Sequence, residues 1–260
     1  MAKPEAIKPV QRTKHINLMV YGDPGVGKTR LIGTAPKTLI LRPPTDHTDS
    51  IRDSDAEEWV IRDWNEMAEA QEYLRHEGAK NWDWVWLDSI SLWQDTGLDD
   101  IWESVIAQKP HRAEFGLDKG EYGRNMQRLA RWVRHMVGMD AVNFGITAHP
   151  FEGTDINGDV KLMPYVQGVN MAEKVMGYMN MVTYLEVREK KNNGGTYRVL
   201  HSQASEDYKA KDQFDALENG KLVEPTMPKI VKLIKAAQGT TPARSQTPKR
   251  RTRRAAKVSE

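Results

Sequence analysis

Eight residues near the N-terminus have the types and the spacing that hold a nucleotide phosphate. The stretch GDPGVGKT, residues 22–29, matches the pattern GxxxxGK[ST] at every fixed position. Its glycines let the backbone wrap a phosphate, its lysine reaches the β- and γ-phosphates, and its threonine hydroxyl can ligate Mg²⁺. The sequence therefore predicts a phosphate loop that binds ATP or GTP with Mg²⁺. The residues expected to contact the nucleotide are Gly22, Asp23, Pro24, Gly25, Val26, Gly27, Lys28, Thr29 and Arg30.

The chain on either side of this stretch has the matching strand–loop–helix context. The apolar run INLMVY at 16–21 predicts a buried strand, and residues 28–34 predict a helix that ends before Pro36. The partial positive charge of a helix N-terminus favours a phosphate at the same place. An ordinary structural turn is the alternative, but such a turn does not require this combination of pattern and context.

Asp88 is the expected second residue on the metal side of the nucleotide. It closes the apolar run at 84–87, and a carboxylate at the carboxyl end of a neighbouring parallel strand faces the phosphate loop. There it can hold Mg²⁺ through water, as a Walker B aspartate does. Thr29 and Asp88 are therefore the predicted metal-side pair. The alternative role is a helix N-cap, since Asp and Ser are both good caps, and the two roles can coexist.

Two further polar residues follow predicted strands. His149 ends the buried run FGITAH, where it could sense the γ-phosphate or position the attacking water, although a lone histidine is often structural. Asp46 follows the strand-like run TLILR at 38–42 and is the chosen candidate for the catalytic base. A polar surface loop is an equally good interpretation of the segment around Asp46. The predicted catalytic residues are Lys28, Asp88, Asp46 and His149.

Strand-like and helix-like runs alternate through the first 150 residues, and a hairpin pattern around KNNGG follows later. This order predicts an α/β fold: a mainly parallel sheet flanked by helices, with antiparallel strands added near the C-terminal end. The expected domains are an N-terminal arm at 1–15, one ATPase domain at 16–238 and a disordered basic tail at 239–260. Strands are predicted at 16–21, 38–42, 59–64, 141–149, 181–189 and 196–203, and a strand that runs into a helix is predicted at 82–90. Helices are predicted at 28–34, 65–77, 91–107, 121–138, 171–179 and 227–238, with a loop at 108–120 and a hairpin or loop at 150–163.

Composition narrows the class of protein. The chain has 260 residues, 39% hydrophobic residues and no cysteine, which fits a soluble globular protein in a reducing compartment. No apolar run has the length of a membrane-spanning helix, and the N-terminus lacks the apolar core of a signal peptide. We therefore expect a cytoplasmic protein with no membrane partner. The net charge of +2 combines +6 on residues 239–260 with −4 on residues 1–238, so the tail is either a cationic arm for nucleic acid or a solubilising extension.

The sequence resembles the RecA-like P-loop ATPases, most closely the phage core-only RecA-like single-strand annealing proteins called the Sak-four group. The resemblance rests on GDPGVGKT at 22–29, VWLDSI at 85–90, FGITAH at 144–149, the segment from Pro164 to Gly168 and YKAKDQF at 208–214. It implies ATP-dependent binding of single-stranded DNA, annealing or recombination in phage DNA metabolism in the host cytoplasm, and assembly into a ring or filament. Members usually have a glutamate after the second strand, where this chain has RPPTDHTD at 42–49, so Asp46 is a substitute candidate.

The resemblance also implies roles for two other segments. DNA-binding loops are expected at about 108–124 and 150–168, and the first mixes cations with aromatic residues, a mixture that suits phosphate contact and base stacking. A solvated helix face is the alternative for the basic residues there. Lys209 and Lys211 resemble lysines that reach the ATP of a neighbouring subunit. The candidate DNA-contacting residues are Lys109, Arg112, Phe115, Lys119 and Arg124.

Two functions are consistent with these residues. The first is an ATPase, stimulated by DNA, that binds single-stranded DNA as a homo-oligomer, with a single-strand binding or replication protein as a possible partner. The second is a nucleotide-regulated loader or adaptor for a replication protein, with little hydrolysis. The atypical segment at 42–49 favours the second, whereas YKAKDQF at 208–214 favours the first.

Overall fold

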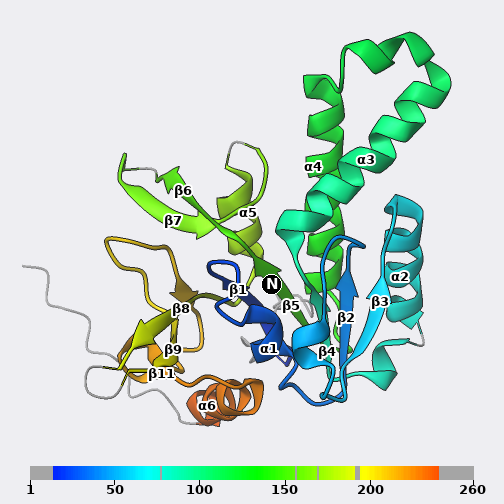
Figure 1. Cartoon of the computed structure of the whole chain (residues 1–260). Coiled ribbons are helices and arrows are strands. Elements are labelled where there is room, and N and C mark those ends of the chain that lie inside the picture. The colour runs from blue at the N-terminus through cyan, green and yellow to red at the C-terminus, as the bar shows by residue number, and fades with distance from the viewer. Residues whose placement is uncertain (1–13, 77, 156, 169, 191–193, 240–260) are drawn as a thin grey trace, which may run out of the picture.

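A nine-stranded sheet forms the centre of the protein (Figure 1). The computed structural model describes residues 14–76, 78–155, 157–168, 170–190 and 194–239. The strand order is β11-β9-β8-β1-β5-β4-β2-β3, with β10 paired to β8. The strands are β1 (Asn17–Tyr21), β2 (Thr38–Arg42), β3 (Glu57–Val60), β4 (Trp84–Leu87), β5 (Asn143–Ala148), β8 (Met181–Glu189), β9 (Thr196–His201), β10 (Lys211–Asp212) and β11 (Lys221–Val223).

The parallel and antiparallel parts of the sheet are separated along its width. From β8 through β1, β5, β4 and β2 to β3, every neighbouring pair is parallel. Antiparallel pairing begins only where β9 and β10 join β8 and β11 joins β9. The predicted α/β class, with antiparallel strands added near the C-terminal end, is confirmed. A separate hairpin of β6 (Pro150–Thr154) and β7 (Val160–Pro164) takes the place of the predicted hairpin or loop.

Helices cover both faces of the sheet because the side chains of each strand alternate between two apolar cores. In β1, Met19 and Tyr21 point to one core, whereas Leu18 and Val20 point to the other. The first core packs against α2 (Trp64–His76), α3 (Ile90–Gln108), α4 (Lys119–Val137) and α5 (Met171–Tyr178), and the second against α1 (Lys28–Ile32) and α6 (Met227–Gly239).

Local capping explains where two helices begin. The predicted strand at 59–64 ends at Val60, because the Asp63 side chain accepts hydrogen bonds from the backbone N–H groups of Asn65 and Glu66 and thereby caps α2. Helix α4 begins at Lys119, two residues before its predicted start, because Asp118 and Glu121 form a reciprocal capping box.

Helices α3 and α4 form a hairpin that projects from the body of the molecule (Figure 1). Their tip is the segment 108–118, which contains a short 3₁₀ helix at Pro110–Glu114 where the sequence predicted a loop. We call this hairpin the helical arm. Its base lies next to β4 and β5, because α3 starts directly after β4.

The two predicted terminal segments lie largely outside the described residues. Residues 1–13 of the predicted N-terminal arm and residues 240–260 of the predicted basic tail belong to this part of the chain. Within the described part, no helix has the length and apolar character needed to cross a membrane.

Candidate nucleotide-binding site

The segment 22–29 forms a tight loop between the end of β1 and the start of α1. Gly25 and Gly27 have φ angles of 82° and 95°, a left-handed region that residues with a Cβ rarely adopt. The Lys28 ammonium donates hydrogen bonds to the carbonyl oxygens of Gly22 (2.8 Å) and Asp23 (3.0 Å), and the residue as a whole is 7% exposed. Burial lowers the pKa of Lys28, while the charges of Asp88, Asp46 and Asp23 act in the opposite direction. The lysine is thus folded back over its own loop.

Asp88 lies directly opposite the start of α1. Its Oδ2 atom accepts a hydrogen bond of 2.8 Å from the Thr29 hydroxyl, and its Oδ1 atom accepts one from the Thr147 hydroxyl of β5. The peptide bond between Asp88 and Ser89 is cis. Ser89, rather than Asp88, caps α3, since its side chain accepts a hydrogen bond from the backbone N–H of Leu92. The Asp88 carboxylate is therefore free of the capping role and faces Thr29.

Burial dominates the electrostatics of Asp88. The side chain is 3% exposed, and burial raises the pKa of Asp88 from 3.8 to about 6, although hydrogen bonds from Thr147 and Thr29 act in the opposite direction. A hydroxyl oxygen and a carboxylate at this spacing are the hard oxygen ligands that Mg²⁺ prefers. A divalent cation would also relieve the cost of the buried negative charge. The donor set therefore fits a magnesium ion held between the loop and β4.

Asp46 lines the same cavity as Lys28, Thr29 and Asp88, because Arg42 organises the segment that carries Asp46. The Arg42 guanidinium binds the Glu58 carboxylate through Nε (2.8 Å) and Nη2 (2.9 Å), and its Nη1 donates a hydrogen bond to the Asp46 carbonyl oxygen (2.8 Å). Hydrogen bonds from Arg42 and Thr48 lower the pKa of Glu58 to about 2. Glu58 is thus engaged in holding the segment, whereas the Asp46 side chain is among those that line the cavity.

His149 also lines this cavity, at the end of β5. Its backbone N–H donates a hydrogen bond to the Ser91 hydroxyl of α3 (2.9 Å), and its carbonyl oxygen accepts one from the backbone N–H of Tyr165 (2.7 Å). Burial and the nearby charge of Lys28 lower the pKa of His149, and the charge of Asp46 acts in the opposite direction. The imidazole is therefore neutral at physiological pH and can accept or donate a hydrogen bond.

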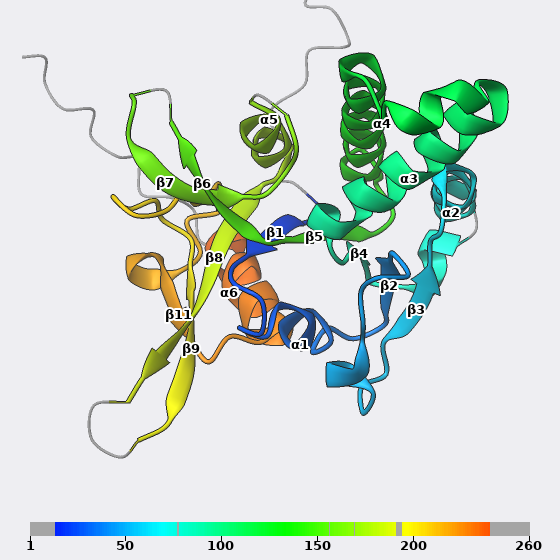
Figure 2. The ribbon, with the colours of Figure 1, turned by 45° about the horizontal axis from the view of Figure 1, so that its top comes forward.

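The four predicted catalytic residues thus meet in one cavity of about 290 Å³. It is lined by Pro24, Gly25, Gly27, Lys28, Thr29, Asp46, Ser50, Asp88, Ser89 and His149. The phosphate loop lies between the β8–β9 hairpin on one side and β2 on the other (Figure 2). The cavity faces the β2, β4 and β5 side of the loop, where strands that lie apart in the sequence bring their carboxyl ends together.

The candidate DNA-contacting residues gather at or near the tip of the helical arm. Phe115 is 76% exposed, and Lys109, Lys119 and Arg124 are exposed as well. Arg112 differs, because its Nη2 atom binds the Glu121 carboxylate (3.0 Å) and the Gly116 carbonyl oxygen (3.0 Å). Four of the five predicted residues therefore present their side chains to solvent, and the fifth supports the tip.

Lys209 and Lys211, predicted to act on a neighbouring subunit, are bonded to α5 of their own chain. The Lys209 ammonium forms an ion pair with Glu173 (2.5 Å), and the Lys211 ammonium donates a hydrogen bond to the Met176 carbonyl oxygen (3.0 Å). A role toward a second subunit would require these bonds to break.

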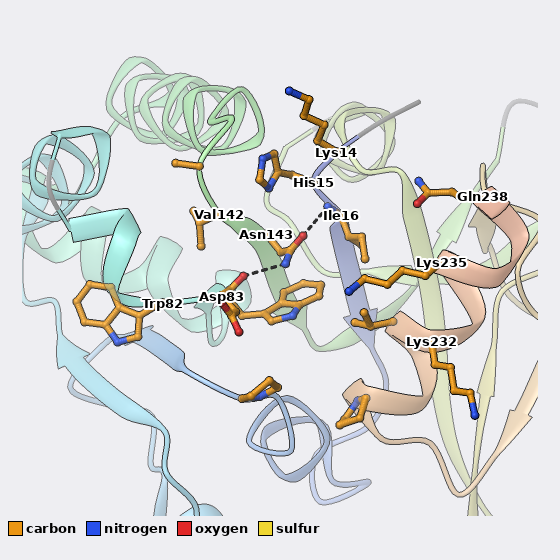
Figure 3. Close-up of a pocket in the computed structure, with 15 residues that line it drawn as sticks. Lys14, His15, Ile16, Trp82, Asp83, Val142, Asn143, Lys232, Lys235 and Gln238 are labelled. Carbon is orange, nitrogen blue, oxygen red and sulfur yellow. Dashed lines mark hydrogen bonds between the residues drawn. The ribbon is translucent and has the colours of Figure 1, made fainter. Parts of the chain in front are cut away.

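A larger cavity, of about 670 Å³, lies at the end of the sheet opposite to the phosphate loop, and Figure 3 shows the residues that line it. Residues at the amino ends of β1, β4 and β5 and on α6 line it, including Ile16, Trp84, Asn143 and Lys235. The Asn143 amide is occupied by hydrogen bonds with the Ile16 N–H and the Asp83 carbonyl oxygen. Parallel α/β sheets bind ligands at the carboxyl ends of their strands, so the smaller cavity at the phosphate loop is the stronger candidate site.

Two residues near the phosphate loop were missing from the sequence-based site. Thr147 lies within the apolar run of β5, one residue before the strand ends, and a single threonine at such a position is only a weak signal. Arg198 comes from β9, and its Nε atom donates a hydrogen bond of 2.7 Å to the Val26 carbonyl oxygen. No local pattern pointed to Arg198, because its place beside the loop depends on the pairing of β8 with both β1 and β9.

This combination of sheet order and site defines a P-loop ATPase with a RecA-like fold. One strand, β5, separates the phosphate-loop strand β1 from the Asp88 strand β4, and all three are parallel. A family model described as an AAA domain matches residues 14–214, and the chain belongs to this family.

The similarity to individual proteins is weaker than the match to the family model. No curated protein is similar enough to count as a match. Similar solved structures include the RadB recombinase (13% identity, TM-score 0.42, 72% of this chain and 79% of that chain). A second is the flagellar accessory protein FlaH from Methanocaldococcus jannaschii (9% identity, TM-score 0.39, 82% of this chain and 87% of that chain). A third is a KaiC-like protein from Pyrococcus horikoshii OT3 (12% identity, TM-score 0.41, 81% of this chain and 89% of that chain).

Proposed function

We propose that this protein binds ATP with Mg²⁺ at residues 22–30 and uses binding and hydrolysis to control its affinity for single-stranded DNA. The helical arm is the proposed DNA-contacting element. The observation that carries the DNA assignment is the exposed Phe115 ring at the arm tip. The exposed cations Lys109, Lys119 and Arg124 lie at or near the same tip and form no ion pair within the described residues, whereas Arg112 is paired with Glu121. Stacking on an aromatic ring and phosphate contact by lysines are the two interactions that bind single strands without sequence preference.

The proposed chemistry assigns one role to each residue of the cavity. Lys28 would neutralise charge on the β- and γ-phosphates, and Thr29 and Asp88 would hold Mg²⁺, which when bound would supply positive charge for phosphoryl transfer. Asp46 orients the attacking water as the base. His149 donates a hydrogen bond that senses the γ-phosphate.

The base of the arm is bonded to the proposed site, which supports a link between nucleotide and DNA. Ser91, in the first turn of α3, accepts a hydrogen bond from the His149 N–H and donates one to the Tyr165 carbonyl oxygen (2.9 Å). Gln94, one turn later, accepts a hydrogen bond from the Gln167 N–H (2.8 Å) through Oε1. A shift of His149 on γ-phosphate binding would therefore act directly on α3.

The arm assignment predicts that Phe115→Ala weakens binding of single-stranded DNA about tenfold, because stacking of a base on an aromatic ring contributes about 1–3 kcal/mol. Fluorescence anisotropy with a labelled oligonucleotide at fixed salt measures this effect. Val223→Ala is the matched control, since Val223 is a 56% exposed apolar residue on β11, away from the arm. Equal affinity of the Phe115→Ala variant and the native protein would contradict the arm assignment.

The basic tail provides an independent prediction. Deleting residues 240–260, which carry the +6 charge, should weaken DNA binding and flatten its dependence on salt by about 0.7 in logarithmic slope for each phosphate that the tail neutralises. A tail of equal length with its lysines and arginines replaced by glutamine separates charge from length. An unchanged affinity and slope would leave the tail without a role in DNA binding.

Assembly into a ring or filament, an annealing or recombination role in phage DNA metabolism, and a single-strand binding or replication protein as partner complete the proposal. They rest on the resemblance of the phosphate loop, the Asp88 strand and the His149 strand to the single-strand annealing group. A homo-oligomer predicts ATP turnover per subunit that rises with protein concentration.

A further inference from the structure

Arg198 contacts the phosphate loop from the side opposite to the metal-side residues. Its Nε atom donates a hydrogen bond of 2.7 Å to the Val26 carbonyl oxygen, and a Cβ placed on Gly27 would lie only 2.7 Å from the same Nε. The guanidinium therefore packs directly on the loop. Arg198 is absent from the cavity that Asp46, Asp88 and His149 share, so it approaches the loop on a separate side.

The β8–β9 hairpin holds Arg198 rigidly in this place. Strand β8 continues past the end of β1, and the Leu185 carbonyl oxygen lies so close to Gly22 that a Cβ there would approach it to 2.2 Å. The Arg198 backbone is fixed on its other side by Glu224, whose N–H donates to the Arg198 carbonyl oxygen (2.8 Å) and whose carboxylate accepts from the Arg198 N–H (3.2 Å). The arginine is thus carried by paired strands rather than by a free loop.

If a nucleotide binds as proposed, its nucleoside lies on the β8–β9 side of the phosphate loop. The γ-phosphate must lie toward Asp88, Asp46 and His149 if these residues perform the chemistry proposed above. A nucleotide is a linear chain from γ-phosphate through α-phosphate and ribose to base, so its base leaves the loop on the opposite side. The β8–β9 hairpin stands on that side (Figure 2).

The outer part of the Arg198 guanidinium is available for a ligand. Only Nε has a hydrogen-bond acceptor within the described residues, which leaves both terminal nitrogens without one there, and the Arg198 residue is half-buried rather than fully enclosed. A guanidinium plane stacks well on aromatic rings and stays charged at every physiological pH, whereas a lysine ammonium has no such plane.

We propose that Arg198 is the nucleoside-positioning residue of this ATPase: it fixes the Val26 end of the phosphate loop through Nε and stacks its guanidinium plane on the purine base. This inference rests on the proposed nucleotide function and adds a specificity-determining contact to it. Stacking favours purine over pyrimidine nucleotides and does not by itself separate ATP from GTP.

Calorimetric titration with two probes tests the proposal, each probe with Mg²⁺. ATP carries the base, whereas inorganic tripolyphosphate carries only the phosphates. Arg198→Ala should weaken ATP binding about tenfold or more, the size of one cation–π stacking contact, and should leave tripolyphosphate binding within about twofold. Arg198→Lys should lose most of the same ATP affinity, because the planar group is gone.

Arg188→Ala is the matched control, since Arg188 lies on the same hairpin and pairs with Glu186 instead of the loop. Its ATP affinity should equal that of the native protein. Equal losses for ATP and tripolyphosphate in Arg198→Ala would show that Arg198 only shapes the loop, and unchanged ATP binding would remove any role; either result overturns the inference. If the native protein binds neither probe, the proposed nucleotide function itself fails.

Discussion

Replacing Lys28 with alanine is expected to abolish ATP turnover, with a loss of at least about 100-fold. Among the residues that line the phosphate-loop cavity, Lys28 carries the one cationic side chain, since His149 is neutral. In that buried position its ammonium opposes the charge of the β- and γ-phosphates, and no other cation among these lining residues can replace it. Because negative charge grows on the leaving β-phosphate in the transition state, turnover should fall further than ATP affinity.

Steady-state phosphate release measures this prediction, and a thermal melt checks the fold. The structure gives no reason for unfolding, since Lys28 bonds only to carbonyl oxygens of its own loop. Lys174→Ala is a suitable control, because Lys174 is an exposed lysine on α5, away from the cavity. Turnover retained by a folded Lys28→Ala protein would sink the assignment of the phosphate loop.

The change Asp88→Asn should have two opposite effects: turnover falls at least about 100-fold, and the nucleotide-free protein becomes more stable at neutral pH. Turnover falls because a neutral amide binds Mg²⁺ far more weakly than a carboxylate. Stability rises because Asn keeps a similar shape while removing a charge from a site that is 3% exposed.

The sign of the pH dependence follows from the raised pKa of Asp88. A carboxyl whose pKa rises on folding from 3.8 to about 6 contributes stability that is complete below pH 3.8 and is lost as the pH rises through 6. Relative to a fully protonated carboxyl, Asp88 then lowers the free energy of unfolding by about 3 kcal/mol at pH 7.5 but by only about 1 kcal/mol at pH 4.5, where the native state keeps it mostly protonated. The gain from Asp88→Asn, measured by denaturant unfolding without nucleotide or Mg²⁺, should therefore shrink by more than half between these values. A gain that stays constant with pH would show that charge burial is not its cause.

Local patterns were sufficient to predict the strand–loop–helix conformation around residues 22–29, most strands and helices, and the grouping of Asp46, Asp88 and His149 in one cavity. Each of these residues follows an apolar run, and the carboxyl ends of parallel strands share one edge of a sheet. The same reasoning made Asp88 a possible cap, but Ser89 has this role, since the two adjacent residues have similar capping propensity and only the local geometry separates them.

Contacts between distant segments could not be predicted in this way. Glu58 forms an ion pair with Arg42 and thereby positions the Asp46 segment, and Thr147 donates a hydrogen bond to Asp88. The sequence around Glu58 and Thr147 does not indicate which residues they contact. The place of Arg198 depends on the register of three strands. Arg112 is of a residue type that often contacts DNA. Its pairing with Glu121 depends on the conformation of the arm tip, which the sequence did not predict.

ATP turnover by the native protein, measured with Mg²⁺ in the presence and absence of single-stranded DNA, tests the central claim most directly. A DNA-controlled ATPase with its site at residues 22–30 should release phosphate faster when single-stranded DNA is present, and the increase should disappear in the Lys28→Ala variant. ATP and DNA binding without any turnover would contradict the ATPase account and favour a nucleotide-regulated loader or adaptor.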